Sequence, residues 1–552
     1  MKSRELAGAY YSLLIANLLS NCLIFHTHHW AVFVFFTLAA TFLLTYAEYL
    51  LGQLIPGKMR SVYYTTLYVL YVLLIAIEVF VIVEFKYNIT EDLMYNILDT
   101  NPGEAKGFFS AYTTPGTVVI FLLSLVALYL LIHAGGSLLA KCGGKRLFIV
   151  ATGLAAVGIG CYLYIGYSFV VLDDGFRATQ YTTLTRILGG AAKVKSRVNT
   201  IDQLRIACTG VKATDLNPAD SSNIVVVIGE SFSRYHSSLY GYRLRTNPKL
   251  EKRRDEDGML VFSDVISRAD QTHEALRSFF STDSLGLGFG YYPLIPVIFR
   301  SAGYTTYLWD NQYLVNSGIS FMSDRKLSEL LYDKRNQQYF GTDGPFLETL
   351  PDVTGLRKTF FIIHLAGQHF YYNDHYEPSF KTFTPEDYDA ALTEIQRTVL
   401  SDYDNATLYN DAMMERILER FDSTETLLFY FTDHGEELYE NGDFSGHTNA
   451  LRSKDLRYQI CSPFLVWMSP SYKKTHPEIC RKLEQARDVP MMTDDVSHLL
   501  MDIAQIQTET YSPYRSAINP AYNRERDRMI LNAYNYDQWL RDNGFSPTVQ
   551  GR

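Results

Sequence analysis

The chain divides into a strongly apolar first third and a mixed polar remainder. Five apolar stretches in the first third approach the roughly 20 residues that a helix needs to cross a bilayer. They lie at Tyr10–Phe25, Ala31–Leu51, Val62–Val83, Thr117–Ala134 and Leu147–Leu172. The pattern predicts an α-helical membrane domain with five spans over residues 1–172.

After residue 220, short apolar runs alternate with stretches of helical periodicity. The runs typical of buried strands are Ile224–Ile228, Tyr304–Leu308, Thr359–His364, Leu427–Thr432 and Phe464–Trp467. Helical periodicity is clearest over Leu400–Phe421 and Thr493–Ile506. Strands that alternate with helices indicate an α/β domain with a mainly parallel sheet. We therefore expect a linker over residues 173–220 and a soluble domain over residues 221–552.

Basic residues gather on one side of the predicted membrane domain. They are Lys2, Arg4, Lys58, Arg60, Lys141, Lys145 and Arg146. The side rich in Lys and Arg is the cytoplasmic side of a membrane protein. Five spans then place everything after Leu172 outside the cytoplasm.

The net charge and the cysteine count argue against a nucleic-acid-binding protein and against a fold held together by many disulfides. A net charge of -9 argues against a nucleic-acid-binding protein, which needs a concentrated basic face. Of the six cysteines, Cys208, Cys461 and Cys480 fall in the soluble part and can form one disulfide at most. An oxidising and a reducing compartment are both compatible with this count.

Two predicted strands end abruptly in metal-ligand residues. Glu230 follows the first strand, and Asp433-His434 follow the fourth. Because α/β sheets place their chemistry at the carboxyl ends of strands, these residues should converge. Glu, Asp and His are ligands that zinc accepts. The alternatives are a helix N-cap for Glu230 and a structural role for the Asp-His pair.

Thr272 lies in a polar loop that opens a predicted helix. It could simply cap that helix. Alternatively, its hydroxyl faces free amides and the positive end of the helix dipole, where a phosphate also binds. A metal beside it would lower the pKa of the hydroxyl and generate a nucleophile.

Three histidines lie close to predicted strand ends. His369 and His447 are candidates for anion binding, protonation of a leaving group or a second metal. His364 lies inside a strand, which favours a structural role. Each histidine could equally be an ordinary polar residue that is satisfied by hydrogen bonds.

The predicted loop between the third and fourth spans lies on the outer face of the membrane. It carries Asn96, Thr100 and Glu104, and part of it has the spacing of a short amphipathic helix. The loop is either a solvated connector or a lip that holds a lipid headgroup. Within the third span, Glu78 should make a polar contact inside the helix bundle.

When the spans, strand-end ligands, Thr272 loop and histidines are read in their order along the chain, the sequence resembles the membrane-bound phosphoethanolamine transferases of Gram-negative envelopes, within the alkaline phosphatase/sulfatase superfamily. The motifs of the resemblance are Gly229-Glu230-Ser-Phe-Ser-Arg234, the Thr272 loop, His364-Leu-Ala-Gly-Gln-His369, Asp402-Tyr-Asp404-Asn405, Asp433-His-Gly-Glu436, His447 and the outer loop from Asn96 to Ala105. Together they cover nearly the whole chain.

The resemblance implies zinc bound by Glu230, Asp433, His434 and the oxygen of Thr272. One zinc ion is expected, and a second is compatible with the motifs. Thr272 would attack phosphatidylethanolamine and form a phosphoethanolaminyl-threonine, which lipid A or another envelope glycan would then accept. The substrate-binding residues would be His369 and His447, together with Asn96, Thr100 and Glu104 of the outer loop. The implied location is the bacterial inner membrane, with several spans and the catalytic domain facing the periplasm.

The chain departs from the family pattern in three places. Phe370-Tyr371 replaces a Gly-Pro pair, which would reshape the acceptor side. The soluble part has too few cysteines for the several disulfides of lipid A enzymes. The Thr272 loop also differs from the lipid A branch and leaves the acceptor open.

Two other function classes fit the sequence. A glycerophosphate transferase or a phosphodiesterase could use the same scaffold with another donor headgroup. A non-enzymatic membrane-tethered binding or sensor domain could keep the fold without the chemistry. The absence of a Cys/Ser-x-Pro-x-Arg segment argues against a sulfatase that matures its nucleophile to formylglycine.

Overall fold

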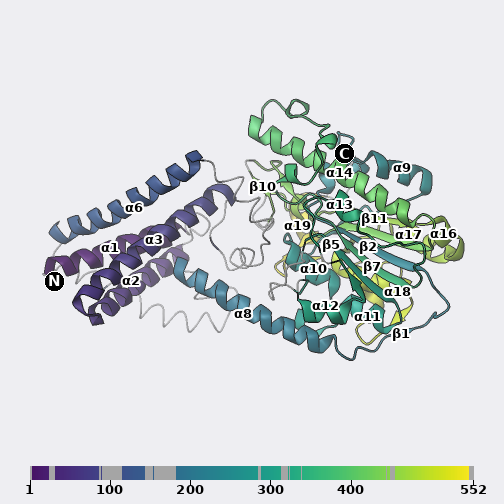
Figure 1. Cartoon of the computed structure of the whole chain (residues 1–552), viewed down its shortest axis with the longest axis horizontal. Helices are drawn as coiled ribbons and strands as arrows, with labels where there is room; N and C mark the ends of the chain where they lie inside the picture. Colours follow the sequence, from purple (N-terminus) through teal and green to yellow (C-terminus); the bar gives the residue numbers. More distant parts are fainter. Residues whose placement is uncertain are drawn as a thin grey trace. The chain divides into compact units, whose positions relative to one another are not determined.

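The computed structural model describes residues 3–23, 31–85, 89, 115–142, 153, 182–283, 288–312, 321–322, 324–336, 338–442, 444–447 and 454–545. The chain forms two compact units, Met1–Ser196 and Arg197–Arg552 (Figure 1). The predicted outer-loop residues Asn96, Thr100 and Glu104 lie outside the described residues, as does nearly all of the predicted fifth span.

The first unit is a bundle of long helices. These are α1 (Ser3–Cys22), α2 (Ala31–Leu54), α3 (Gly57–Phe85), α6 (Pro115–Cys142) and the beginning of α8 (Thr183–Ala207). The first four overlap in sequence with the first four predicted spans. Within the described residues, two segments, Gly57–Val83 and Val118–Lys141, are long and apolar enough to cross a membrane. The structure therefore does not confirm five spans.

Glu78 lies inside this bundle and is fully buried. Both of its carboxylate oxygens accept from a guanidinium nitrogen of Arg186, at 2.5 and 2.7 Å. Thr183 also donates to Glu78, at 2.9 Å. The predicted polar contact of Glu78 is thus confirmed. Its partners lie in α8, a helix within the segment that we expected to be a linker.

A seven-stranded sheet forms the centre of the second unit. Its order is β3 (Leu260–Val261), β11 (Phe464–Met468), β8 (Thr426–Thr432), β2 (Asn223–Gly229), β7 (Thr359–His364), β5 (Thr305–Asp310) and β6 (Lys334–Arg335). The pairings from β8 to β6 are parallel, while β11 runs antiparallel to both of its neighbours. The sheet is therefore mixed and mostly parallel.

Both faces of the sheet are covered, so every residue of its central strands β2, β7 and β8 is buried and most of these residues are apolar. In β2, Ile224, Val226 and Ile228 join one core, and Val225 and Val227 join the other. The first core includes α10 (Thr272–Phe280), α11 (Ile295–Ser301) and α18 (Val496–Ile503). The second core includes the 28-residue helix α14 (Glu394–Phe421).

Shorter elements surround these layers. The remaining α-helices are α9 (Pro248–Asp257), α12 (Arg325–Leu331), α13 (Asp343–Leu347), α15 (Arg457–Ile460), α16 (Pro470–Thr475), α17 (Pro477–Ala486) and α19 (Tyr536–Asp542). The short strand pairs are β1 (Thr214–Asp215) with β13 (Ile506–Gln507), β4 (Val265–Ile266) with β12 (Met491–Met492), β9 (Glu437–Leu438) with β10 (Ser445–Gly446), and β14 (Met529–Ile530) with β15 (Tyr534–Asn535). Cys208, Cys461 and Cys480 are free thiols.

Candidate metal centre and active site

The register of the central strands brings the two predicted ligand segments together. Gly229, the last residue of β2, pairs with Thr432, the last residue of β8. The next residues are Glu230 and Asp433, and both are buried. Two parallel strands that end in register therefore place two carboxylates side by side.

The side chains of Asp433 and His434 face each other through two hydrogen-bond acceptors, Oδ2 of Asp433 and Nε2 of His434. His434 Nδ1 lies 2.8 Å from the carbonyl oxygen of Gly435, so Nδ1 donates and Nε2 keeps a lone pair. Burial, followed by the charge of His447, lowers the pKa of His434 to about 4. Asp433 Oδ2 lies 3.1 Å from this Nε2 and has no hydrogen-bond partner among the described residues. Two acceptors this close in a buried site need a proton or a cation between them.

Glu230 completes a set of three ligands. With Asp433 and His434, it offers ligand atoms that all lie within 4.8 Å of one another. Its Oε2 accepts from Gln312 Nε2 at 3.0 Å, while Oε1 accepts from the hydroxyls of Ser231 and Thr272 at 2.9 and 3.1 Å. Carboxylate oxygens and an imidazole nitrogen are suitable donors for zinc. The residues therefore fit a divalent metal.

The backbone beside Glu230 is strained. Ser231 has φ 53, a left-handed conformation that is uncommon for a residue with a side chain. Its amide donates to Asp433 Oδ1 at 3.1 Å. Gly367 also lies against this turn, with φ +53, and a Cβ there would lie 2.8 Å from the backbone nitrogen of Glu230. The strained turn therefore holds Glu230 against the neighbouring ligand.

Thr272 is the first residue of α10 and does not cap the helix. The N-cap is Gln271, in extended conformation, and it makes no side-chain capping bond. The Thr272 hydroxyl instead lies 3.1 Å from Glu230 Oε1 and 3.3 Å from His434 Nε2. The structure thus places Thr272 beside the cluster of Glu230, Asp433 and His434.

A second layer of polar residues adjoins His434. The His447 ring lies 4.1 Å from the His434 ring, and His447 Nδ1 lies 2.7 Å from Glu436 Oε2. Tyr372 donates to the other oxygen of Glu436 at 2.6 Å. Burial raises the pKa of Glu436 to about 8 and lowers the pKa of His447 to about 4. His434, Glu436 and His447 form a second group of potential metal ligands.

The other two histidines differ in their surroundings. His364 ends β7, and its Nδ1 lies 3.0 Å from Asp310 Oδ1 in a buried ion pair. His369 lies in the following loop, near enough to affect the pKa of His447 and Glu436. In the same loop, Tyr371 adopts a left-handed conformation with φ 68, at the position where the chain departs from the family.

Three residues at the site were not among the predicted site residues. They are Gln312, Glu436 and Tyr372. Glu436 was detectable, because it lies two residues after His434 in the acidic stretch Asp433-His-Gly-Glu-Glu. Gln312 lies two residues after β5, so it could have been found as a polar residue that closely follows a predicted strand. Tyr372 carries no comparable signal.

Comparisons with known proteins match this unit. The sulfatase family model matches residues 222–506. Phosphoethanolamine transferase EptC of Escherichia coli O18:K1:H7 (strain RS218 / NMEC) is 31% identical over 328 residues, which is 56% of this chain and 55% of that protein. The chain thus spans about half the length of the EptC relatives that it matches.

Two solved structures share the fold. The zinc complex of the carboxyl-terminal periplasmic domain of Escherichia coli EptC has a TM-score of 0.53 and 27% identity, and covers 59% of this chain and 94% of that domain. The integral membrane protein lipooligosaccharide phosphoethanolamine transferase A of Neisseria meningitidis has a TM-score of 0.62 and 20% identity, and covers 93% of this chain and 98% of that protein.

Proposed function

The chain belongs to the sulfatase family, and from this membership we propose that it is a zinc-dependent phosphoethanolamine transferase. The donor is phosphatidylethanolamine, and the acceptor is lipid A or another envelope glycan. The name of the EptC relative and the zinc complex of the similar EptC domain support the proposal. The observation that carries it is the convergence of Thr272 with three buried zinc-type ligands at one sheet edge.

Glu230, Asp433, His434 and the Thr272 oxygen would hold zinc. When bound, zinc lowers the pKa of a neighbouring hydroxyl and stabilises negative charge on a phosphoryl group. The protein contributes the position of Thr272. Because this residue begins α10, its hydroxyl lies at the positive end of a helix dipole, where a phosphate is favoured.

The reaction has two steps at Thr272. The Thr272 hydroxyl loses its proton to solvent, its oxygen attacks the phosphorus of phosphatidylethanolamine, the bond from phosphorus to the glycerol oxygen breaks, and diacylglycerol leaves. The product on the protein is a phosphoethanolaminyl-threonine. A hydroxyl or phosphate oxygen of the acceptor then attacks the same phosphorus and restores the threonine.

Glu436 and His447 supply a proton for the leaving oxygen. A carboxyl group with a pKa of about 8 is mostly protonated at neutral pH. It lies 2.7 Å from His447 Nδ1, so Glu436 can pass its proton to this imidazole as His447 Nε2 donates to the departing glycerol oxygen. His369 contacts the phosphate from the opposite loop.

The apolar helices of the first unit fit a lipid donor. We place the protein in the bacterial inner membrane, with the catalytic unit in the periplasm. The basic loops of the predicted membrane domain give this orientation. A phospholipid in the outer leaflet would then present its phosphate to the catalytic unit.

The donor and the nucleophile can be tested together. The full-length protein in detergent is incubated with phosphatidylethanolamine labelled in the headgroup, and separately with headgroup-labelled phosphatidylglycerol. We expect label from phosphatidylethanolamine alone to remain on the protein. Thr272→Ala should abolish labelling, and Thr272→Ser should retain part of it. Label from phosphatidylglycerol would instead indicate a glycerophosphate transferase.

A further inference from the structure

A pocket of about 650 Å³ is built from the same two chain segments that carry the metal ligands. Tyr235–Arg243 follows Glu230, and Leu438–Glu440 follows Asp433. No metal-site residue lines the pocket. Its remaining lining comes from the region of Asp387–Leu400 and from Tyr458. The pocket is therefore a separate site that the same segments position.

Tyrosine dominates the lining. The tyrosines are Tyr235, Tyr242, Tyr388, Tyr439 and Tyr458. The rings of Tyr235 and Tyr458 pack with their centroids 4.8 Å apart. The Tyr235 hydroxyl is buried and makes no hydrogen bond to any described residue. Aromatic faces with hydroxyl groups at their edges suit a sugar, which has apolar C–H faces and hydrogen-bonding edges.

The charged groups around the pocket disfavour an anion. Asp387, Asp389 and Glu440 line it, and Arg243 is the exposed cation among the lining residues. His236 is buried between Asp404, 2.7 Å from Nδ1, and Glu440, 3.4 Å from Nε2. A phosphate would meet these carboxylates at close range. Sugar hydroxyls and sugar amines can donate to them.

The floor of the pocket is held by hydrogen bonds and is connected to the metal site. Asp404 accepts hydrogen bonds from Tyr242 and Tyr388 at 2.8 and 2.6 Å. The His236 ring packs edge-on against Tyr403, at 5.2 Å. Tyr403 in turn donates to the carbonyl oxygen of Ser231 at 2.6 Å. A preorganised wall of this kind reduces the entropy cost of binding.

The volume distinguishes a sugar from a small amine. Cavities of a few hundred Å³ or more hold ligands much larger than an ethanolamine headgroup. We propose that this pocket binds a neutral or amine-bearing sugar unit of the acceptor glycan. That the sugar belongs to the acceptor rests on the proposed function, whereas sugar binding itself does not.

Direct binding tests the pocket without catalysis. The full-length Thr272→Ala protein, in a detergent without a sugar headgroup, is titrated with N,N′-diacetylchitobiose and followed by saturation-transfer NMR. We expect binding that Tyr458→Ala weakens about tenfold or more, because one of the two packed aromatic rings of the pocket wall is lost. Arg243→Ala removes an exposed lining side chain that donates to the carbonyl oxygen of Asp387 and lies over the Tyr388 ring, and it should also weaken binding.

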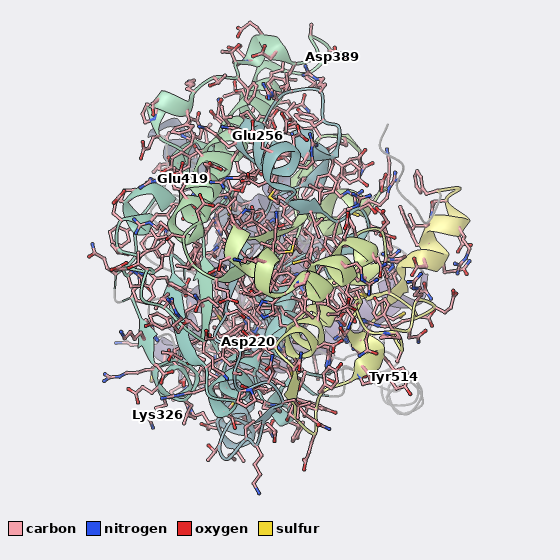
Figure 2. All side chains as sticks on the ribbon, turned by 90° about the vertical axis from the view of Figure 1, so that its right-hand side faces the viewer. Asp220, Glu256, Lys326, Asp389, Glu419 and Tyr514 are labelled. Atoms are coloured by element: carbon pink, nitrogen blue, oxygen red, sulfur yellow. The ribbon has the colours of Figure 1, made fainter. Side chains whose placement is uncertain are left out.

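Tyr514→Ala is the matched control. Tyr514 is 62% exposed, does not line the pocket, and lies well apart from Asp389 of the pocket (Figure 2). It should leave binding unchanged. The proposal is overturned if chitobiose does not bind, if Tyr458→Ala and Arg243→Ala both bind as before, or if phosphoethanolamine displaces the sugar.

A kinetic measurement separates this proposal from the proposed function. In the protein with Thr272 intact, Tyr458→Ala should raise the KM for the acceptor and leave donor labelling of Thr272 unchanged. If sugar binds at the pocket but Thr272 is never labelled, the proposed function fails and the pocket stands. If Thr272 is labelled but no sugar binds, the pocket proposal fails alone.

Discussion

Asp433→Asn should make the metal-free protein more stable and abolish its stabilisation by zinc. Asp433 Oδ1 accepts from the amides of Ser231 and His434, at 3.1 and 2.8 Å, and asparagine keeps these bonds through its carbonyl oxygen. The amide nitrogen of asparagine then replaces Oδ2, 3.1 Å from His434 Nε2. A repulsive pair of acceptors thus becomes a hydrogen bond.

The size of the effect follows from the burial of the site. A buried polar atom without a partner costs about 1–3 kcal/mol, so the variant should gain about that much in EDTA. The wild-type protein should gain about 2.7 kcal/mol when free zinc exceeds its Kd by 100-fold. The variant, which lacks a ligand, should gain almost nothing. Each change amounts to a shift of a few degrees in melting temperature.

The assay is thermal melting of the full-length protein in detergent, with EDTA and with a zinc titration. Asp352→Asn is the control, because Asp352 is exposed and its carboxylate bonds only within its own turn. The control should melt like the wild type under both conditions. An Asp433→Asn protein that is less stable than the wild type in EDTA would refute the reasoning, as would one that zinc stabilises to the wild-type extent.

Two further predictions concern the backbone and the pocket. Gly367→Ala should lower the free energy of unfolding by more than the roughly 1–2 kcal/mol of left-handed strain, because its Cβ would lie 2.8 Å from the backbone nitrogen of Glu230. The same change should reduce zinc binding. Gly303→Ala is the control in the same melts: Gly303 has φ +92 and a Cβ there would meet nothing within 4 Å, so this variant should lose only the strain energy. Burial disfavours charge on His236, but Asp404 outweighs it and raises the pKa to about 9. The stabilisation from this pair is therefore fully present below pH 6.5, and it falls by about 3 kcal/mol as the pH rises through 9. His236→Gln should remove this pH dependence of the free energy of unfolding. Equal pH profiles of stability in the wild type and the variant would contradict the prediction.

The core of the catalytic unit was predictable because its strands are buried on both faces. The predicted strand Thr359–His364 has a continuous apolar run between its two end residues, and the structure has β7 at the same bounds. The convergence of Glu230 with Asp433 followed from the rule that parallel strands end together. The antiparallel direction of β11 was not predictable, because an apolar run does not encode its orientation.

Long-range partners were harder to predict from the sequence. The pairing of Glu78 with Arg186 joins residues 108 positions apart, so the sequence indicated only that Glu78 needed a partner. Tyr372 reaches Glu436 across 64 positions and has no motif of its own. The free state of Cys208 likewise depends on packing. Pattern reasoning finds strand ends well, but contacts that tertiary packing creates leave little trace in the sequence.

The most direct test of the account is peptide mass mapping of the protein after it turns over phosphatidylethanolamine. The full-length protein, loaded with zinc and given donor without acceptor, is quenched in acid and digested. The account predicts that the peptide containing Thr272 gains the mass of one phosphoethanolaminyl group, and that added acceptor removes it. A modified residue elsewhere, or turnover with Thr272 never modified, would contradict the central claim.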